Sequence, residues 1–195
     1  MLRLAPFGLI LTALCVLAPG CAEGPMKTDP KVLAQLREQL VLAEEPDGAV
    51  TTLDWREGLE ESSEEQDESD DSVVLVGTVG GMPNPWGDTE PAFPWRDGEA
   101  TFFLVDPSTA AEFAAHEEEV GGSHDDCPFC AREAVQKANA IAAVRFLDEA
   151  GKPTKVDARE LFGLKAGDMV VVRGQASLLG EDLLVLDADA LHVRR

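Results

Sequence analysis

Basic residues are scarce in this chain of 195 residues. It has 16 lysines and arginines against 37 aspartates and glutamates, which gives a formal net charge of −21 at pH 7. The acidic excess lies both before and after residue 72, so it is not confined to a tail. A surface this negative repels phosphate backbones, and no basic patch with interleaved aromatic residues is present. The sequence therefore argues against nucleic acid as a partner.

Cysteine is also rare, and its distribution limits what it can do. Of the four cysteines, Cys15 lies in an apolar N-terminal run and Cys21 directly follows that run. Only Cys127 and Cys130 fall in the part of the chain that we expect to fold. One pair cannot act as the disulfide framework of a domain of roughly 120 residues, so the core must be mainly hydrophobic.

Several motifs that carry catalysis are missing. The glycine-rich stretch VGTVGG, residues 76–81, leads into a proline-rich loop and not into the helix that a phosphate-binding loop requires. Ser123, His124 and Asp125 are adjacent in sequence, whereas the members of a catalytic triad are brought together by the fold. We therefore expect a binding or structural module rather than an enzyme.

The N-terminus contains the longest apolar run. Residues 1–20 have a single charge at Arg3, followed by an apolar stretch that is too short for a comfortable membrane span and is typical of an export signal. The run ends in APGC and resembles a bacterial lipoprotein signal. The resemblance implies lipidation of Cys21 and a membrane anchor in the cell envelope; ordinary secretion is the alternative. Either route places the mature protein outside the cytoplasm, where thiols are not kept reduced by default.

Residues 21–56 read as a short tether followed by a helix. Asp29 is the expected N-cap of this helix, because a proline follows it at the first helical position. Leu33, Leu36 and Leu40 recur at helical spacing and form a narrow apolar stripe. We expect the stripe to pack on the protein's own domain; docking onto a partner is the alternative.

Residues 57–71, EGLEESSEEQDESDD, are a low-complexity acidic stretch with no large apolar residue after Leu59. Such a composition cannot bury enough apolar surface to offset the entropy that is lost on ordering. We expect a disordered linker that holds the following domain away from its anchor.

Residues 72–195 contain the strand signals of a small β domain, with short β-branched runs separated by turns and helical patterns. The final part, LKAGDMVVVRGQASLLGEDLLVLDADALHV, resembles an oligonucleotide/oligosaccharide-binding barrel (OB-fold). The resemblance implies a mainly β fold with interposed helices, built as an OB-like antiparallel β-barrel, in which residues 108–140 are an insertion. Ligand binding would follow from this fold only by analogy.

The insertion carries the most distinctive sequence motif of the chain. Cys127 and Cys130 form a C-x-x-C pair, with His124 three residues before it and His116 eight residues before His124. Thiolate and imidazole ligands suit zinc, and copper also accepts them. We therefore expect His116, His124, Cys127 and Cys130 to bind one zinc-like ion in a structural site.

Two other interpretations of the cysteine pair are open at this point. The tetrapeptide CPFC resembles the active site of glutaredoxins, which implies a thiol–disulfide oxidoreductase with Cys127 as nucleophile and Cys130 as resolving thiol. The preceding strand ends much further before Cys127 than it does in the thioredoxin-like family. The third interpretation is a local pair that only tightens its loop; a disulfide there closes little chain and contributes little entropy.

Three aromatic residues, Trp86, Phe93 and Trp95, lie in the proline-rich loop between the first two expected strands. They could line a ligand groove at the barrel rim, but we expect them to cover the open end of the barrel. The sequence identifies no particular protein or small molecule as a partner.

Overall fold

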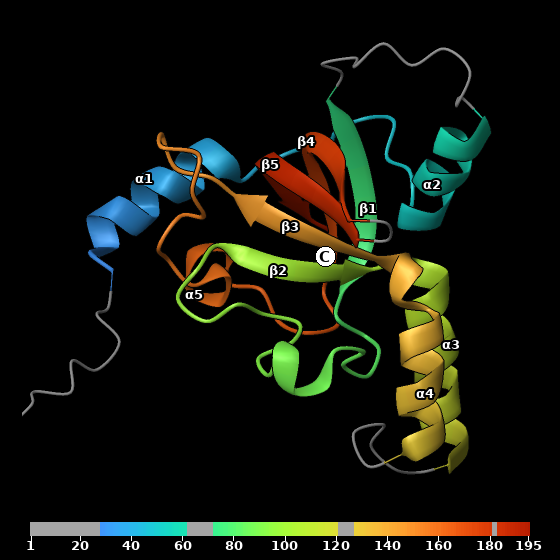
Figure 1. The fold of residues 1–195 in the computed structure, drawn as a ribbon. Coiled ribbons are helices and arrows are strands. Elements are labelled where there is room, and N and C mark those ends of the chain that lie inside the picture. Colours follow the sequence, from blue (N-terminus) through green and yellow to red (C-terminus); the bar gives the residue numbers. More distant parts are fainter. Residues whose placement is uncertain (1–27, 62–71, 121–126, 181–182) are drawn as a thin grey trace, which may run out of the picture.

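The computed structural model describes residues 28–61, 72–120, 127–180 and 183–195 (Figure 1). Their elements are, in chain order, α1 (Pro30–Leu40), α2 (Thr52–Glu61), β1 (Val73–Val79), η1 (Gly87–Thr89), β2 (Thr101–Val105), α3 (Pro107–Val120), α4 (Pro128–Gln136), η3 (Ala138–Ala140), β3 (Ile141–Phe146), α5 (Ala158–Phe162), β4 (Met169–Leu179) and β5 (Leu183–Val193). The predicted fold class, mainly β with interposed helices, is confirmed. Of the helices in the described ranges, none has both the length and the apolar character needed to cross a membrane.

The five strands close into a barrel in the order β1-β2-β3-β5-β4, with β4 paired back onto β1. Strands β3 and β5 are parallel, and the other neighbouring pairs are antiparallel. The sequence predicted an antiparallel barrel throughout. A closed ring with an odd number of strands must contain a parallel pair, because strand direction cannot alternate all the way round. The closed five-stranded barrel is compatible with an OB-like fold.

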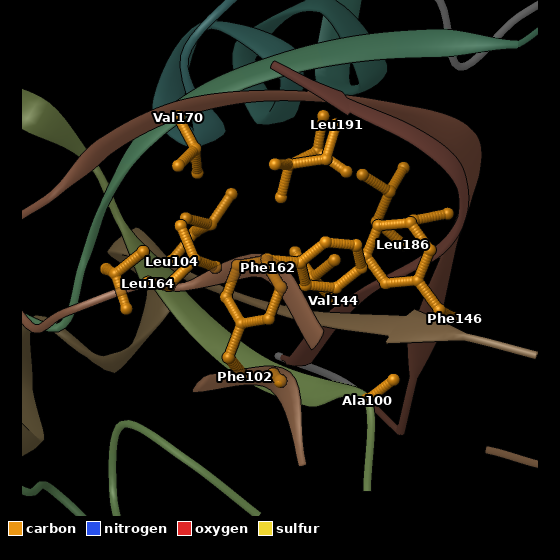
Figure 2. Packing of buried hydrophobic residues seen from close by; sticks show 14 of the residues in the cluster. Ala100, Phe102, Leu104, Val144, Phe146, Phe162, Leu164, Val170, Leu186 and Leu191 are labelled. Atoms are coloured by element: carbon orange, nitrogen blue, oxygen red, sulfur yellow. The ribbon is translucent and has the colours of Figure 1, made fainter. Parts of the chain in front are cut away.

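Large apolar side chains fill the barrel (Figure 2). Because alternate side chains of a strand point to opposite faces, Phe102 and Leu104 of β2 and Val144 and Phe146 of β3 point inward together. The same cluster includes Leu75, Val170, Val172, Leu184, Leu186 and Leu191. Burial of each such side chain contributes about 1.5–3 kcal/mol, so this interior is the main source of the barrel's stability.

Helices α5 and α1 close one end of the barrel. The ring of Phe162 on α5 lies against Phe146, with 4.6 Å between the ring centroids. Arg37 of α1 donates from two guanidinium nitrogens to the carbonyl oxygens of the last turn of α5, at 2.6 Å each. Those carbonyls have no partner within their own helix, so the guanidinium satisfies them and fixes α1 against α5.

The helix that the sequence predicted near the N-terminus is confirmed as α1. The side chain of Asp29 caps it by accepting a hydrogen bond from the backbone nitrogen of Lys31 at 2.8 Å. The leucine stripe faces the barrel: Leu33 is buried in the interior cluster, and Leu36 and Leu40 are partly buried against it. The stripe therefore packs on the protein's own domain.

A second helix, α2, follows in the N-terminal segment. It begins at a reciprocal cap, in which the backbone nitrogen of Asp54 donates to the Thr51 hydroxyl at 3.2 Å and the nitrogen of Thr51 donates to the Asp54 carboxylate at 3.4 Å. Trp55 packs against the interior cluster. Residues 57–61, predicted as the start of a disordered linker, are therefore helical; the rest of that acidic stretch lies outside the described residues.

Helices α3 and α4 are inserted between β2 and β3, where the sequence predicted an insertion. In Figure 1 they lie side by side at the lower right, away from α1. We call this pair the hairpin. All residues of β2 are buried, because the barrel interior covers one face of the strand and the hairpin and the proline-rich loop cover the other.

Candidate metal centre

Helix α3 carries His116 and is capped by the side chain of Asp106. One carboxylate oxygen accepts hydrogen bonds from the backbone nitrogen and the hydroxyl of Ser108, at 2.9 and 2.6 Å, and the other accepts from the backbone nitrogen of Leu53 at 3.3 Å. Burial opposes the ionisation of Asp106, but the hydrogen bonds from Ser108, Thr51 and Leu53 outweigh it and hold its pKa below the ordinary value. The carboxylate thus fixes the start of α3 and connects it to the segment that contains α2.

Helix α4 begins at Cys127, whose thiol is the cap. Its Sγ accepts a hydrogen bond from the backbone nitrogen of Cys130 at 3.3 Å, and Pro128 occupies the first helical position. Asp126, the acidic residue that precedes Cys127, lies outside the described residues. The Cys127 sulfur therefore lies at the positive end of α4.

The hairpin brings three of the four predicted ligands together. The donor atoms of His116, Cys127 and Cys130 all lie within 4.8 Å of one another. His116 comes from α3, the two cysteines come from the start of α4, and both thiols are free. One imidazole nitrogen and two sulfurs at this spacing could hold one metal ion. The fourth predicted ligand, His124, lies outside the described residues.

The two thiols of the site differ in acidity and in access. The thiol of Cys130 donates a hydrogen bond to the Cys127 sulfur, and this contact, helped by the backbone N–H of Cys130, lowers the pKa of Cys127. The same thiol–thiol contact, followed by burial, raises the pKa of Cys130 to about 11. Cys130 is only 1% exposed, whereas Cys127 is half-buried. Cys127 is therefore the more accessible sulfur and the one that ionises first.

The site lies on a small apolar layer between the hairpin and the outer face of the barrel, which we call the outer cluster. From the hairpin it contains Ala110 and Phe113 of α3 and Cys130 and Ala134 of α4. From the barrel and the loop after β1 it contains Met82, Phe103, Val105, Ile141, Ala143 and Val185. Cys130 thus belongs both to the candidate metal centre and to the packing that seats α4 on the barrel.

Lys137, at the C-terminal end of α4, joins the two helices near the barrel. Its ammonium pairs with Glu112 of α3 and lies 3.5 Å from the carboxylate of Glu133. It also lies 5.9 Å from the ring centroid of Phe113. His116 comes one helical turn after Glu112. The hairpin therefore has a polar connection near the barrel and the candidate metal centre one turn further out.

The three aromatic residues of the proline-rich loop pack on their own domain. Trp95 is 8% exposed and belongs to the barrel interior, with its ring centroid 6.2 Å from that of Phe102. Trp86 and Phe93 pack on Phe103 of β2, at centroid distances of 4.9 and 5.5 Å. Trp86, but neither of the other two, also lines a cavity of about 170 Å³ beside the ends of strands β4 and β5. Trp95 therefore packs inside the barrel, and Trp86 and Phe93 cover the outer face of β2.

Sequence reasoning missed two residues that position the site, Asp106 and Lys137. Asp106 precedes a proline, as Asp29 does, and the repeat of that pattern could have identified it as the cap of α3. Lys137 has no comparable signal, because its pairing with Glu112 depends on how the two helices pack. The predicted signal at residues 1–20 and the predicted acyl site Cys21 lie outside the described residues.

A comparison of the chain with models of known protein families gave no match, and neither did a comparison with curated protein sequences. A functional interpretation therefore depends on the residues of the site.

Proposed function

We propose that the protein is an exported module of the cell envelope whose hairpin binds one zinc-like ion through His116, Cys127 and Cys130, with His124 as the fourth ligand. The observation that carries the proposal is the convergence of three donor atoms from two helices within 4.8 Å. Two sulfurs and an imidazole nitrogen suit zinc, and copper also accepts them. With four protein ligands the ion has no open position, so its role is to hold α3 and α4 together.

Metal analysis of the purified, reduced protein tests this proposal. We expect about one zinc ion per chain, and Co²⁺ in its place should give the charge-transfer absorption of thiolate ligation. His116→Gln should lower the affinity by at least about 100-fold. His192→Gln is the matched control, because His192 lies on β5, where its Nδ1 is 3.1 Å from the carbonyl oxygen of Leu42. Equal zinc binding by the two variants would contradict the site.

His124→Gln, measured in the same titration, separates four protein ligands from three. If His124 is a ligand, the variant should lose affinity as His116→Gln does, and the cobalt spectrum should change because a water replaces the imidazole. An unchanged affinity and spectrum would restrict the site to His116 and the two cysteines.

The envelope location is a separate part of the proposal. It depends on the resemblance of residues 1–21 to a lipoprotein signal, which implies an acyl anchor at Cys21. Cells grown with a labelled fatty acid should label the protein, and Cys21→Ser should abolish the label. No label on the protein, or label that survives this substitution, would reject an acyl anchor at Cys21.

A second candidate function, thiol–disulfide exchange, is favoured by the asymmetry of the cysteine pair. Cys127 is accessible and has a lowered pKa, whereas Cys130 is buried with a pKa of about 11, as expected of a nucleophile and a resolving thiol. The surroundings differ from a thioredoxin-like site, because the element that precedes the pair in the described ranges is α3 and not a strand. Insulin reduction that requires Cys127 would support this function; no turnover with fully reduced protein would exclude it.

A further inference from the structure

The cysteine pair can form bonds of two different kinds. Cys127 is the cap residue of α4 and Cys130 lies in its first turn, with their sulfurs within 4.8 Å of each other. A pair at this spacing can bind one metal ion, and it can also close into a disulfide after a small movement of the side chains. Both bonds use the same sulfur electrons, so they exclude each other.

We propose that the pair is a redox-controlled clamp: reduced, it holds a zinc-like ion together with His116, and oxidised, it closes into a Cys127–Cys130 disulfide and releases the ion. This inference rests on the metal site proposed above and adds its regulation. The compartment fits, because thiols of an exported protein meet oxidants that the cytoplasm removes.

The two states connect different parts of the molecule. The metal joins α3 to α4, because His116 comes from one helix and the cysteines from the other. The disulfide joins only two residues at the start of α4 and forms no bond to α3. Oxidation therefore removes a link between the helices without replacing it. The remaining connections are the outer cluster and the pairing of Lys137 with Glu112, which lies nearer the barrel.

The replacement of the metal by a disulfide also takes place within the apolar packing of the hairpin. Cys130 is 1% exposed and packs in the outer cluster with Phe113 of α3 and Phe103 of β2. The other α4 residue in this cluster is Ala134, which buries little surface. Loss of the metal link should therefore loosen the outer end of the hairpin while the barrel interior, a separate cluster, stays closed.

A low-molecular-weight disulfide serves as the oxidant. The Cys127 sulfur attacks first, because it is half-buried and Cys130 is not accessible. It displaces one thiolate from the oxidant and forms a mixed disulfide. The Cys130 sulfur, after losing its proton or its metal ion, attacks Cys127 and displaces the second thiolate. Two electrons pass to the oxidant, one S–S bond breaks and one forms, and the ion leaves unchanged as a divalent cation.

The test uses the purified chain loaded with Zn²⁺ and treated with increasing oxidised glutathione. Released zinc is measured with a chromophoric chelator, free thiols with a colorimetric reagent, and the product by mass. We expect one zinc ion released for each two thiols lost, with a mass loss of two hydrogens. Hydrogen exchange should become at least about tenfold faster in the outer turns of α3 and α4 and stay unchanged in the barrel strands.

Two variants at half-buried positions serve as controls. His116→Gln keeps both thiols, so its pair should oxidise faster than in the zinc-loaded protein, with no further loosening of the hairpin. Cys127→Ser cannot form the disulfide, so glutathione should not accelerate exchange in its hairpin. Reduced protein that takes up no zinc contradicts the metal site, and the clamp with it. Zinc uptake followed by thiol loss without zinc release, or by zinc release without loosening, contradicts the clamp alone.

Discussion

Large side chains fill the interior of the barrel, whereas the side chains that the hairpin adds to the outer cluster are mostly small. Phe102, Phe146 and a set of leucines pack inside the ring of strands. The hairpin contributes one large side chain, Phe113, to the outer cluster, together with Cys130 and two alanines. Because stabilisation follows the apolar area that is buried, the barrel should be stable by itself and the hairpin should depend on specific connections.

This difference in apolar packing explains why a site that switches between metal-bound and disulfide states would lie on the hairpin. A unit with few buried apolar contacts can open without unfolding the rest of the protein. A link of one metal ion or one ion pair is then a large part of what holds it. The same link on the barrel would be a small addition to a filled core.

Phe102→Ala should have the largest effect and should break the barrel. Phe102 is fully buried, and its truncation leaves a cavity that the surrounding strands cannot fill, at a cost of about 3–5 kcal/mol. Phe129→Ala on α4 is the matched control. That ring is 75% exposed, so its removal should change the free energy of unfolding by less than about 0.5 kcal/mol. Urea unfolding followed by tryptophan fluorescence measures both. Similar losses of unfolding free energy in the two variants would contradict the view that the barrel interior is the main source of stability.

Much of the barrel could be predicted from the sequence, because its strands carry local signals. The β-branched runs around Gly180 and the run that contains Phe102 predicted strands, and Asp29 followed by proline predicted α1. The start of α2 was missed, although Thr51 and Asp54 have the spacing of a reciprocal cap. The acidic residues that follow outweighed that signal in the prediction of a linker.

The candidate site was only partly predictable. The C-x-x-C spacing and the nearby His116 predicted the candidate ligands, because thiol and imidazole groups are recognised from residue type alone. The burial of Cys130 in the outer cluster was not predictable, since it depends on how α4 packs against β2 and β3. Nor could the pairing of Lys137 with Glu112 be read from the sequence, because the two residues belong to different helices.

Asp106→Asn should have an intermediate effect and should weaken the base of the hairpin. It removes a buried charge that accepts hydrogen bonds from Ser108, Thr51 and Leu53, at a cost of about 1–2 kcal/mol at pH 7. The pKa of Asp106 is lowered in the folded protein. Its contribution is therefore fully present above the unfolded pKa of about 3.9 and is lost as the pH falls through the folded pKa.

The difference in free energy of unfolding between the natural protein and Asp106→Asn should accordingly become smaller below about pH 4. Urea unfolding at pH 7 and near pH 3 measures it. Asp29→Asn is the control for capping itself, because that cap is exposed and asparagine caps as well as aspartate does. A stability difference that stays constant between pH 7 and pH 3 would show that the charge of Asp106 does not stabilise the folded protein.

Lys137→Met should have the smallest effect on the whole protein and the most local one. The substitution keeps the aliphatic stem but removes the ammonium that pairs with Glu112 and faces the ring of Phe113. Because such pairs are partly exposed, the cost should be about 0.5 kcal/mol, which corresponds to about twofold to threefold faster hydrogen exchange in α4.

Lys155→Met is the matched control, because it breaks an exposed ion pair with Glu99 that lies outside the hairpin. It should leave exchange in α4 unchanged. If the hairpin depends on specific connections, zinc should reduce the effect of Lys137→Met, since the metal supplies a second link between the same helices. An effect of equal size with and without zinc would mean that the two links act on separate motions, and the hairpin would then not behave as one unit.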